Sequence, residues 1–266
     1  IAQRALARLG DEIWQNSKIQ VQTGKIIDDR PLYWTRLALK RFIKQSPSVF
    51  SNSQLTTLLE VFETNSRGYN DMGFSQITDK KLLLTGFDPF LLDRNLKQSN
   101  PSGLTALLLD GVVIEYQQGD KKITAEINTA MIPVRFEDFD QGEIESLLAP
   151  FYITNRVDMI ATVSMGRSDF DLEHFPGLRR SSQAPDNLNV YTGATRDNPI
   201  IPLLPGRVLA PEEFVEYSLP FLAMMQAKGH YKVNDNKGIT MMNLGKATDI
   251  IATDLVELTN KVSVQG

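Results

Sequence analysis

The sequence has no cysteine among its 266 residues. Disulfide bonds, thiolate metal sites and a thiol nucleophile are therefore excluded. Histidine is also scarce, since His174 and His230 are the only two. Within this sequence, a reaction that needs an imidazole has only these two side chains to use.

Long hydrophobic runs are absent as well. No stretch approaches the roughly 18 apolar residues of a membrane-spanning helix, so we expect a soluble protein, either cytoplasmic or exported after loss of a signal peptide. The 28 basic and 32 acidic residues give a net charge of −4, which leaves no broad positive field for a polyphosphate backbone. We expect neither a membrane nor a nucleic acid as partner.

No metal or cofactor is expected from the motifs present. Acidic residues gather at Glu137, Asp138, Asp140 and Glu143, but their spacing does not match a calcium-binding loop. Carboxylates in such a position are typical of the first turn of a helix, where they complement the helix dipole.

The first 78 residues predict a helical extension. Apolar residues recur at helical spacing in three stretches: one ends near Asn16, one begins near Pro31, and one is capped by Ser51 or Ser53. Residues 65–79 are interpreted as a linker to a second domain at residues 79–266. The extension is interpreted as structural, for example as a dimer contact or a lid.

The second domain opens with residues 82–84, an apolar run that breaks at Thr85-Gly86. Such a run is typical of a strand buried on both faces, and ligands of open α/β sheets bind at the carboxyl ends of the strands. Strands alternate with helices over residues 80–260. The pattern predicts a three-layer α/β/α fold with a mixed, largely parallel sheet.

Residues 85–90, TGFDPF, followed by Asn100-Pro101-Ser102, resemble the opening motif of the pyroglutamyl peptidase I family, the pyrrolidone carboxyl peptidases. The resemblance implies that Phe87, Phe90 and Asn100 bind substrate, with the two phenylalanines forming an apolar slot for a lactam ring. A peptide or a small lactam-like molecule is the implied ligand. Leu91-Leu92 replaces the paired glycines of the family, and the insert before Asn100 is longer.

Further motifs of that family follow in register. Gly166-Arg167, Leu172-Glu173 and Pro185-Asp186-Asn187 are similar to the segments around the family's catalytic glutamate. The resemblance implies that Glu173 holds the place of the carboxylate that orients the catalytic histidine. A salt-bridge or capping role is the alternative, and it is favoured where no imidazole is present to orient.

Other residues of the family's site are replaced. Gln183 stands where the family has an arginine, although Arg179 and Arg180 are near in sequence. Residues 230–243 resemble the nucleophile segment and put Met242 at the place of the cysteine. A thioether has no proton to lose and cannot attack an amide.

The end of the sequence also lacks the family's histidine. We expect a helix over 211–227, a second helix over 244–260, and a strand over 261–264, where Ser263 is nearest to the place of that histidine. A rebuilt triad would combine His174 with one of four hydroxyl groups, those of Ser164, Ser181, Ser182 and Thr240. Because neighbours on a strand face opposite sides, Glu173 and His174 cannot form its carboxylate–imidazole pair, and His174 is expected at the surface.

Three functions remain open at this point. The first is a catalytically inactive relative that acts as a binding or assembly protein and retains the apolar pocket. The second is an active hydrolase, removing N-terminal pyroglutamate with a rebuilt site or with residues beyond Gly266. The third is a structural role in a homo-oligomer, with the helical extension changing the contacts between copies.

Overall fold

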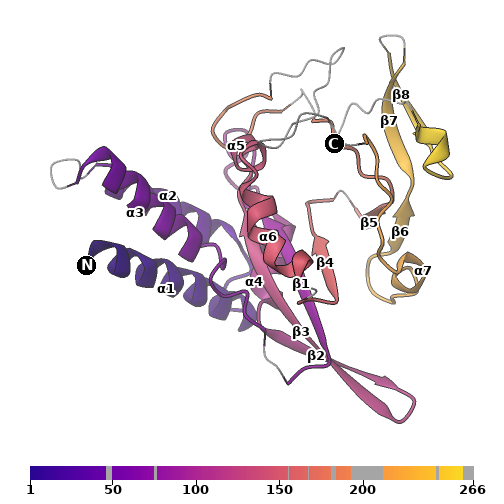
Figure 1. The fold of residues 1–266 in the computed structure, drawn as a ribbon, viewed down its shortest axis with the longest axis horizontal. Coiled ribbons are helices and arrows are strands. Elements are labelled where there is room, and N and C mark those ends of the chain that lie inside the picture. Colours follow the sequence, from indigo (N-terminus) through magenta and orange to yellow (C-terminus); the bar gives the residue numbers. More distant parts are fainter. Residues whose placement is uncertain are drawn as a thin grey trace. The chain divides into compact units, whose positions relative to one another are not determined.

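A computed structural model describes residues 1–45, 50–74, 77–154, 156–166, 168–180, 184–192, 212–243 and 246–259 (Figure 1). The chain divides into two compact units. The first unit contains Ile1–Val134 and Ile144–Met165, and the second contains Arg135–Glu143 and Gly166–Gly266. Each unit is described by itself.

Three helices open the first unit: α1 (Ala2–Gln22), α2 (Arg30–Lys44) and α3 (Asn52–Asn65). Pro31 lies in the first turn of α2. The hydroxyl of Ser51 accepts a hydrogen bond from the backbone N–H of Gln54, and the Gln54 side chain accepts one from the backbone N–H of Ser51. These helix starts confirm the prediction. The expected end of the first helix near Asn16 was wrong, because α1 buries Val21 in the core together with Trp14.

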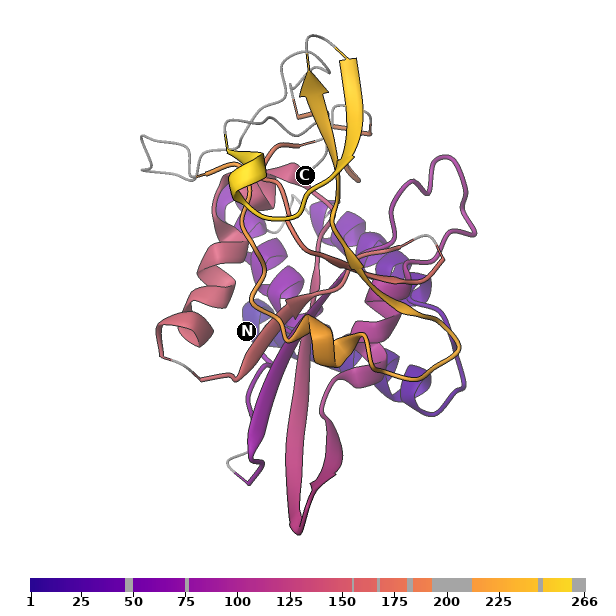
Figure 2. The same ribbon diagram turned by 90° about the vertical axis from the view of Figure 1, so that its right-hand side faces the viewer.

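The sheet of the first unit has the strand order β2-β3-β1-β4. Its strands are β1 (Lys80–Phe87), β2 (Val112–Gln118), β3 (Lys121–Ile132) and β4 (Met159–Thr162). β1 runs parallel to both β3 and β4, whereas β2 pairs with β3 in an antiparallel hairpin that extends beyond the helices (Figure 2). The predicted mixed, largely parallel sheet is confirmed.

Helices cover both faces of this sheet. On one face, α4 (Pro101–Leu109) and α1 enclose Leu107, Met131 and Trp14. On the other face, α6 (Glu143–Ile153) contributes Phe151 to a cluster with Leu83 and Ala130. Ala130 and Met131 belong to different clusters because successive side chains of a strand point to opposite faces. The first unit therefore has the three-layer α/β/α architecture.

The segment between α3 and β1 is packed rather than exposed over part of its length. Ser66 and Arg67 are buried, and the Arg67 carbonyl accepts a hydrogen bond of 2.9 Å from the backbone N–H of Met131. Gly68 has a φ of +78° and lies directly against the Trp14 indole. A domain boundary between residues 78 and 79 stays a prediction.

The second unit has two small sheets. β5 (Phe170–Glu173) pairs in parallel with β6 (Val233–Asn236), and β7 (Gly238–Asn243) pairs antiparallel with β8 (Lys246–Ile251). The short helices are α5 (Phe136–Asp140), α7 (Phe221–Met224) and the 3-10 turn η1 (Val256–Leu258). The buried core consists of Phe175, Phe214, Ile239, Met241, Ala252 and Leu258.

Two helices expected in this unit were wrong. Of the described part of 211–227, only Phe221–Met224 is an α-helix, because the backbone before it bonds to another segment: the Leu178 N–H donates to the Glu213 carbonyl and the Tyr217 N–H to the His174 carbonyl. The helix expected over 244–260 is replaced by β8 and η1. Pairing with β7 places Ile250 opposite Ile239 against the core, which outweighs local helical preference.

Replacing Gly86 with alanine should strongly destabilise the first unit. A Cβ atom there would lie 2.1 Å from the backbone oxygen of Ser102, so β1 and α4 would have to separate, at a cost of about 2 kcal/mol or more. Gly73→Ala is the matched control, since its Cβ would meet no atom within 4 Å. Urea unfolding should show a much lower midpoint for Gly86→Ala only, and equal midpoints would contradict this packing.

Candidate functional site

The loop that follows β1 is organised around the buried carboxylate of Asp88. The Arg36 Nη2 atom lies 2.7 Å from both carboxylate oxygens, and the Arg67 Nη2 atom lies 2.8 Å from one of them. The side chains of Asp88, Arg36 and Arg67 are at most 3% exposed. This ion-pair cluster joins α2, the segment after α3, and the end of β1.

Arg67 makes further contacts with Glu63 and with the backbone of β3. Its Nε donates to Glu63 at 2.8 Å, and its Nη1 donates to the Met131 carbonyl at 3.1 Å. Burial disfavours the charged form, but the negative charges of Asp88 and Glu63 outweigh that effect and raise the pKa of Arg67. The Nε and Nη1 atoms of Arg36 have no hydrogen-bond partner among the described residues.

Asn100 caps α4 and bonds to the same loop. Its Oδ1 accepts hydrogen bonds from the Ser102 N–H (3.0 Å) and hydroxyl (2.8 Å), while its Nδ2 donates to the Asp88 carbonyl at 2.9 Å. The Phe87 N–H donates to the Ser102 hydroxyl at 3.1 Å. The Asn100 side chain, predicted to bind substrate, is thus engaged within the chain and is 1% exposed.

Asp29 approaches the start of α4 from the helical extension. Both of its carboxylate oxygens lie 3.1 Å from the backbone nitrogen of Asn100, and one would lie 2.9 Å from a Cβ atom at Gly103. Asp29 is fully buried. Burial raises the pKa of Asp29 to about 7, although the hydrogen bond from Asn100 acts in the opposite direction.

The predicted site residues are divided between the two units. Phe87, Phe90 and Asn100 lie in the first unit, and both phenylalanines are half-buried. Glu173 and Met242 lie in the second unit. Their joint site, with the lactam slot, stays a prediction.

Glu173 ends β5 and is exposed. Its carboxylate accepts a hydrogen bond of 3.1 Å from the Asn236 amide. Met242 lies within β7, opposite Ala247 of β8. The segment was expected to turn into a helix directly after Met242, and the hairpin corrects this. Asp186 of the Pro-Asp-Asn segment organises a local turn, since it accepts bonds from the N–H groups of Phe136, Leu188 and Val190.

His174 is not a surface residue as predicted, but is 2% exposed. Its Nδ1 lies 2.5 Å from Asp235 Oδ1, and its Nε2 lies 3.1 Å from Glu216 Oε1. Phe175, Tyr217 and Phe221 surround the ring, with centroids 4.4–5.1 Å away. The side chains of Glu173 and His174 were expected on opposite faces of the strand, and the exposure of Glu173 and the burial of His174 agree with this.

The partners of this histidine are far away in the sequence, so spacing alone could not identify them. Asp235 also accepts a hydrogen bond of 3.2 Å from the Tyr217 hydroxyl. Burial, together with the charge of Asp235, raises the pKa of Tyr217 to about 12. Because carboxylates occupy both ring nitrogens of His174, neither nitrogen is left for a hydroxyl nucleophile.

The other residues considered for a rebuilt site either bond to different partners or lie outside the described residues. Thr240 donates to Asp249 at 2.7 Å, Arg179 pairs with Glu213, and Arg180 lies 2.7 Å from Asp140. Ser164 is exposed in the first unit. Five residues singled out in the sequence lie outside the described residues: Arg167, Ser181, Ser182, Gln183 and Ser263.

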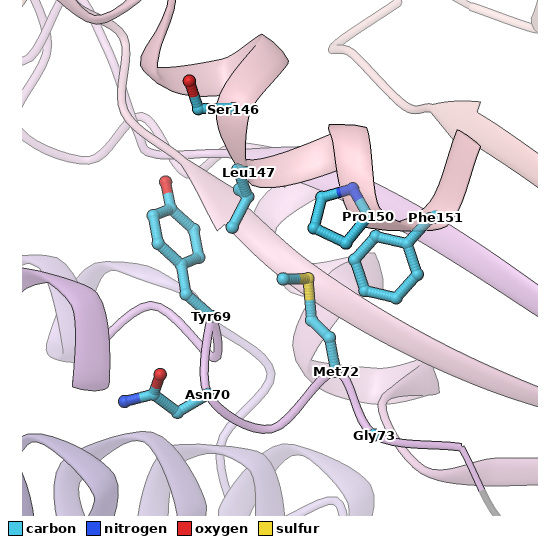
Figure 3. A pocket seen from close by; sticks show the side chains of 8 residues that line it. All are labelled: Tyr69, Asn70, Met72, Gly73, Ser146, Leu147, Pro150 and Phe151. Carbon is cyan, nitrogen blue, oxygen red and sulfur yellow. The ribbon is translucent and has the colours of Figure 1, made fainter. Parts of the chain in front are cut away.

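The first unit also has a pocket that the sequence did not indicate. It has a volume of about 350 Å³ and lies between residues 69–73 and α6 (Figure 3). Met72, Leu147, Pro150 and Phe151 give it apolar walls, and Tyr69, Asn70 and Ser146 bring polar groups to it.

The described residues have neither a cluster of metal-binding side chains nor a membrane-spanning helix. They contain no cluster of three or more His, Cys, Asp or Glu side chains arranged to hold a metal ion. None of their helices has the length and the apolar character needed to cross a membrane.

Comparisons with known proteins give two kinds of match. Residues 81–207 match the family model described as the PA0049 C-terminal domain, and residues 1–63 match the PA0049 N-terminal domain. The chain is 34% identical over 201 residues to an uncharacterized protein, PA0049, of Pseudomonas aeruginosa. This match covers 69% of the chain but only 36% of the relative. The chain thus spans about a third of the length of that relative.

Among solved structures, the chain is similar to the pyrrolidone carboxyl peptidase of Pyrococcus furiosus. The structures of that enzyme and its cysteine-free mutant match with a TM-score of 0.39 at 24% identity, over 55% of this chain and 58% of that chain. A further mutant of the enzyme matches with a TM-score of 0.38.

Replacing Asp88 with asparagine should strongly lower the stability of the first unit. The change leaves Arg36 and Arg67 with uncompensated buried charge, which typically costs about 3–5 kcal/mol. Glu115→Gln is the matched control, because its ion pair with Lys122 is more than half exposed. Equal free energies of unfolding for the two variants would contradict the buried cluster.

Asp29 should make the stability depend on pH. Its pKa is raised from 3.8 to about 7 in the folded chain, so its contribution is fully present below pH 3.8 and is lost as the pH rises through about 7. The slope is at most about 1.4 kcal/mol per pH unit. Asp29→Asn should flatten this slope in urea unfolding between pH 4 and 8. Parallel pH profiles for variant and wild type would disprove the assignment.

Proposed function

We propose that the chain is a member of the PA0049 family with a pyroglutamyl peptidase-like fold that binds or assembles with other molecules and does not hydrolyse peptides. The observation that carries the proposal is the burial of Asp88 and Asn100, two polar residues of the TGFDPF and Asn-Pro-Ser motifs, in contact with the helical extension. Arg36 pairs with Asp88, and Asp29 bonds to Asn100. The polar groups of Asp88 and Asn100, beside the implied lactam slot, are therefore bonded to side chains of the helical extension.

The chemistry available to the chain supports the same proposal. No thiol is present, and Met242 at the place of the nucleophile cannot form an anion. His174 is buried, and its ring nitrogens bond to Asp235 and Glu216. A general base must reach the proton that it removes, which this histidine cannot do while Glu216 covers Nε2.

An active hydrolase with a rebuilt site is the second candidate. The observation in its favour is the imidazole–carboxylate pair of His174 and Asp235, the type of pair that orients a catalytic base. Removal of N-terminal pyroglutamate would require the displacement of Glu216 and a nucleophile at Nε2. A homo-oligomer built through the helical extension is compatible with the assembly role.

Hydrolysis of a pyroglutamyl-coumarin substrate distinguishes these candidates. We expect the purified chain to release no coumarin above the buffer rate, because loss of a nucleophile or its base lowers turnover by about 10⁶ in a serine protease. An active pyrrolidone carboxyl peptidase serves as positive control. Turnover that disappears in Glu173→Gln would refute the proposal, since Glu173 is exposed and its replacement disturbs no core contact.

A further inference from the structure

We propose that the outer face of α2 is a docking surface for an acidic amphipathic helix of a partner protein. The inference deepens the assembly function proposed above, and rests on it, by naming the surface and the class of partner. Three observations carry it: the spacing of apolar residues on that face, their exposure, and the distribution of charge along α2.

Both faces of α2 carry apolar residues. The inner face buries Leu32, Tyr33 and Ile43, together with Arg36. The outer face carries Trp34, Leu37, Ala38, Arg41 and Phe42, which we name the α2 stripe. These residues follow the spacing i, i+3, i+4, i+7 and i+8, which aligns them along one side of a helix.

The large apolar side chains of the α2 stripe are open to solvent. Trp34 is 42% exposed, Leu37 39% and Phe42 69%. Single exposed apolar residues are common on protein surfaces, but three aligned on one helix face are typical of an interaction site. Tryptophan and phenylalanine are also among the residues most enriched in the cores of interfaces.

The charges on α2 indicate the kind of partner. The helix has five basic residues and no acidic residue. Three of the basic residues have partners within the chain: Arg30 pairs with Asp28, Arg36 with Asp88, and Lys40 with Glu63. Arg41 and Lys44 are exposed and form no ion pair within the described part of the chain. They lie at the carboxyl end of the α2 stripe.

This charge pattern favours an acidic partner over a second copy of the chain. Two α2 helices packed against each other would bring basic residues together without any acidic residue to compensate them. A membrane is disfavoured too, since lipid-binding segments typically carry about 4–8 clustered basic residues and α2 has two unpaired ones on a chain of net charge −4.

An antiparallel partner helix satisfies both the apolar and the charged groups. Its apolar residues at helical spacing would cover Trp34 and Leu37. Its first turn would lie beside Arg41 and Lys44, where acidic residues also complement the positive end of its own dipole. A stripe of five residues is far smaller than the roughly 20–30 residues per side of a stable interface, so we expect affinity in the micromolar range.

Trp34 provides a direct reporter of docking. The chain has two tryptophans, and Trp14 is 1% exposed, so a change of solvent access affects mainly the emission of Trp34. The probe is a designed, fluorescein-labelled helical peptide of about 18 residues, with leucines at helical spacing flanked by glutamates. A second peptide with lysines in place of the glutamates is its matched control. A titration without the label follows Trp34 emission.

We expect saturable binding of the glutamate peptide, a blue shift of Trp34 emission and no binding of the lysine peptide. The double variant Arg41→Glu/Lys44→Glu should weaken binding of the glutamate peptide at least tenfold and create binding of the lysine peptide. Leu37→Ala should weaken it several-fold. The matched control Lys97→Glu/Lys228→Glu changes the same charge at exposed positions elsewhere and should bind like wild type. Circular dichroism and unfolding midpoints confirm that each variant is folded.

Several results would overturn the proposal. One is the absence of saturable binding, and another is equal binding of both peptides. A third is binding to anionic vesicles without binding to the peptide. If Arg41→Glu/Lys44→Glu abolishes that vesicle binding, the partner is lipid. A dimer that dissociates in Leu37→Ala makes a second copy the partner. Coumarin release with intact peptide binding refutes only the proposed lack of hydrolysis, whereas failed binding without coumarin release refutes only the docking surface.

Discussion

The carboxylate of Asp88 is the group on which the first unit depends. Asp88 directly follows the parallel strand β1, and its carboxylate pairs with two guanidinium groups, those of Arg36 and Arg67. Burial of a charged carboxylate is costly unless such partners compensate its charge. The helical extension and the sheet are thereby joined through one ionised group, and Arg67 adds the backbone of β3 to the same cluster.

The same contacts involve the segment that resembles the opening motif of the pyroglutamyl peptidases. In this segment, the Phe87 N–H donates to Ser102, and the Asp88 carboxylate accepts from Arg36 and Arg67. Asn100 is engaged in the same way, because Asp29, Asp88 and Ser102 satisfy its hydrogen bonds. With these groups engaged internally, the partner surface that we propose lies elsewhere, on the outer face of α2.

Local signals in the sequence were reliable where an element is stabilised by its own residues. The start of α2 at Pro31, the capping box of Ser51 and the apolar run of β1 could each be predicted from a few neighbouring positions. Prediction failed in the second unit, where a helix was expected over 244–260 but Lys246–Ile251 forms β8 and pairs with β7. It also failed for His174, since Asp235 and Glu216, which hold its ring, lie 61 and 42 positions away.

The sequence by itself determined what this chain cannot do: without cysteine, no thiolate can form on it, whatever its fold. It also determined that a largely parallel sheet would be covered by helices, because periodicity is a local property. Only the tertiary structure decided which groups neutralise Asp88, since Arg36 and Arg67 lie 52 and 21 positions away. Ion pairs of this kind depend on distance in space, and a linear pattern of residues does not contain that distance.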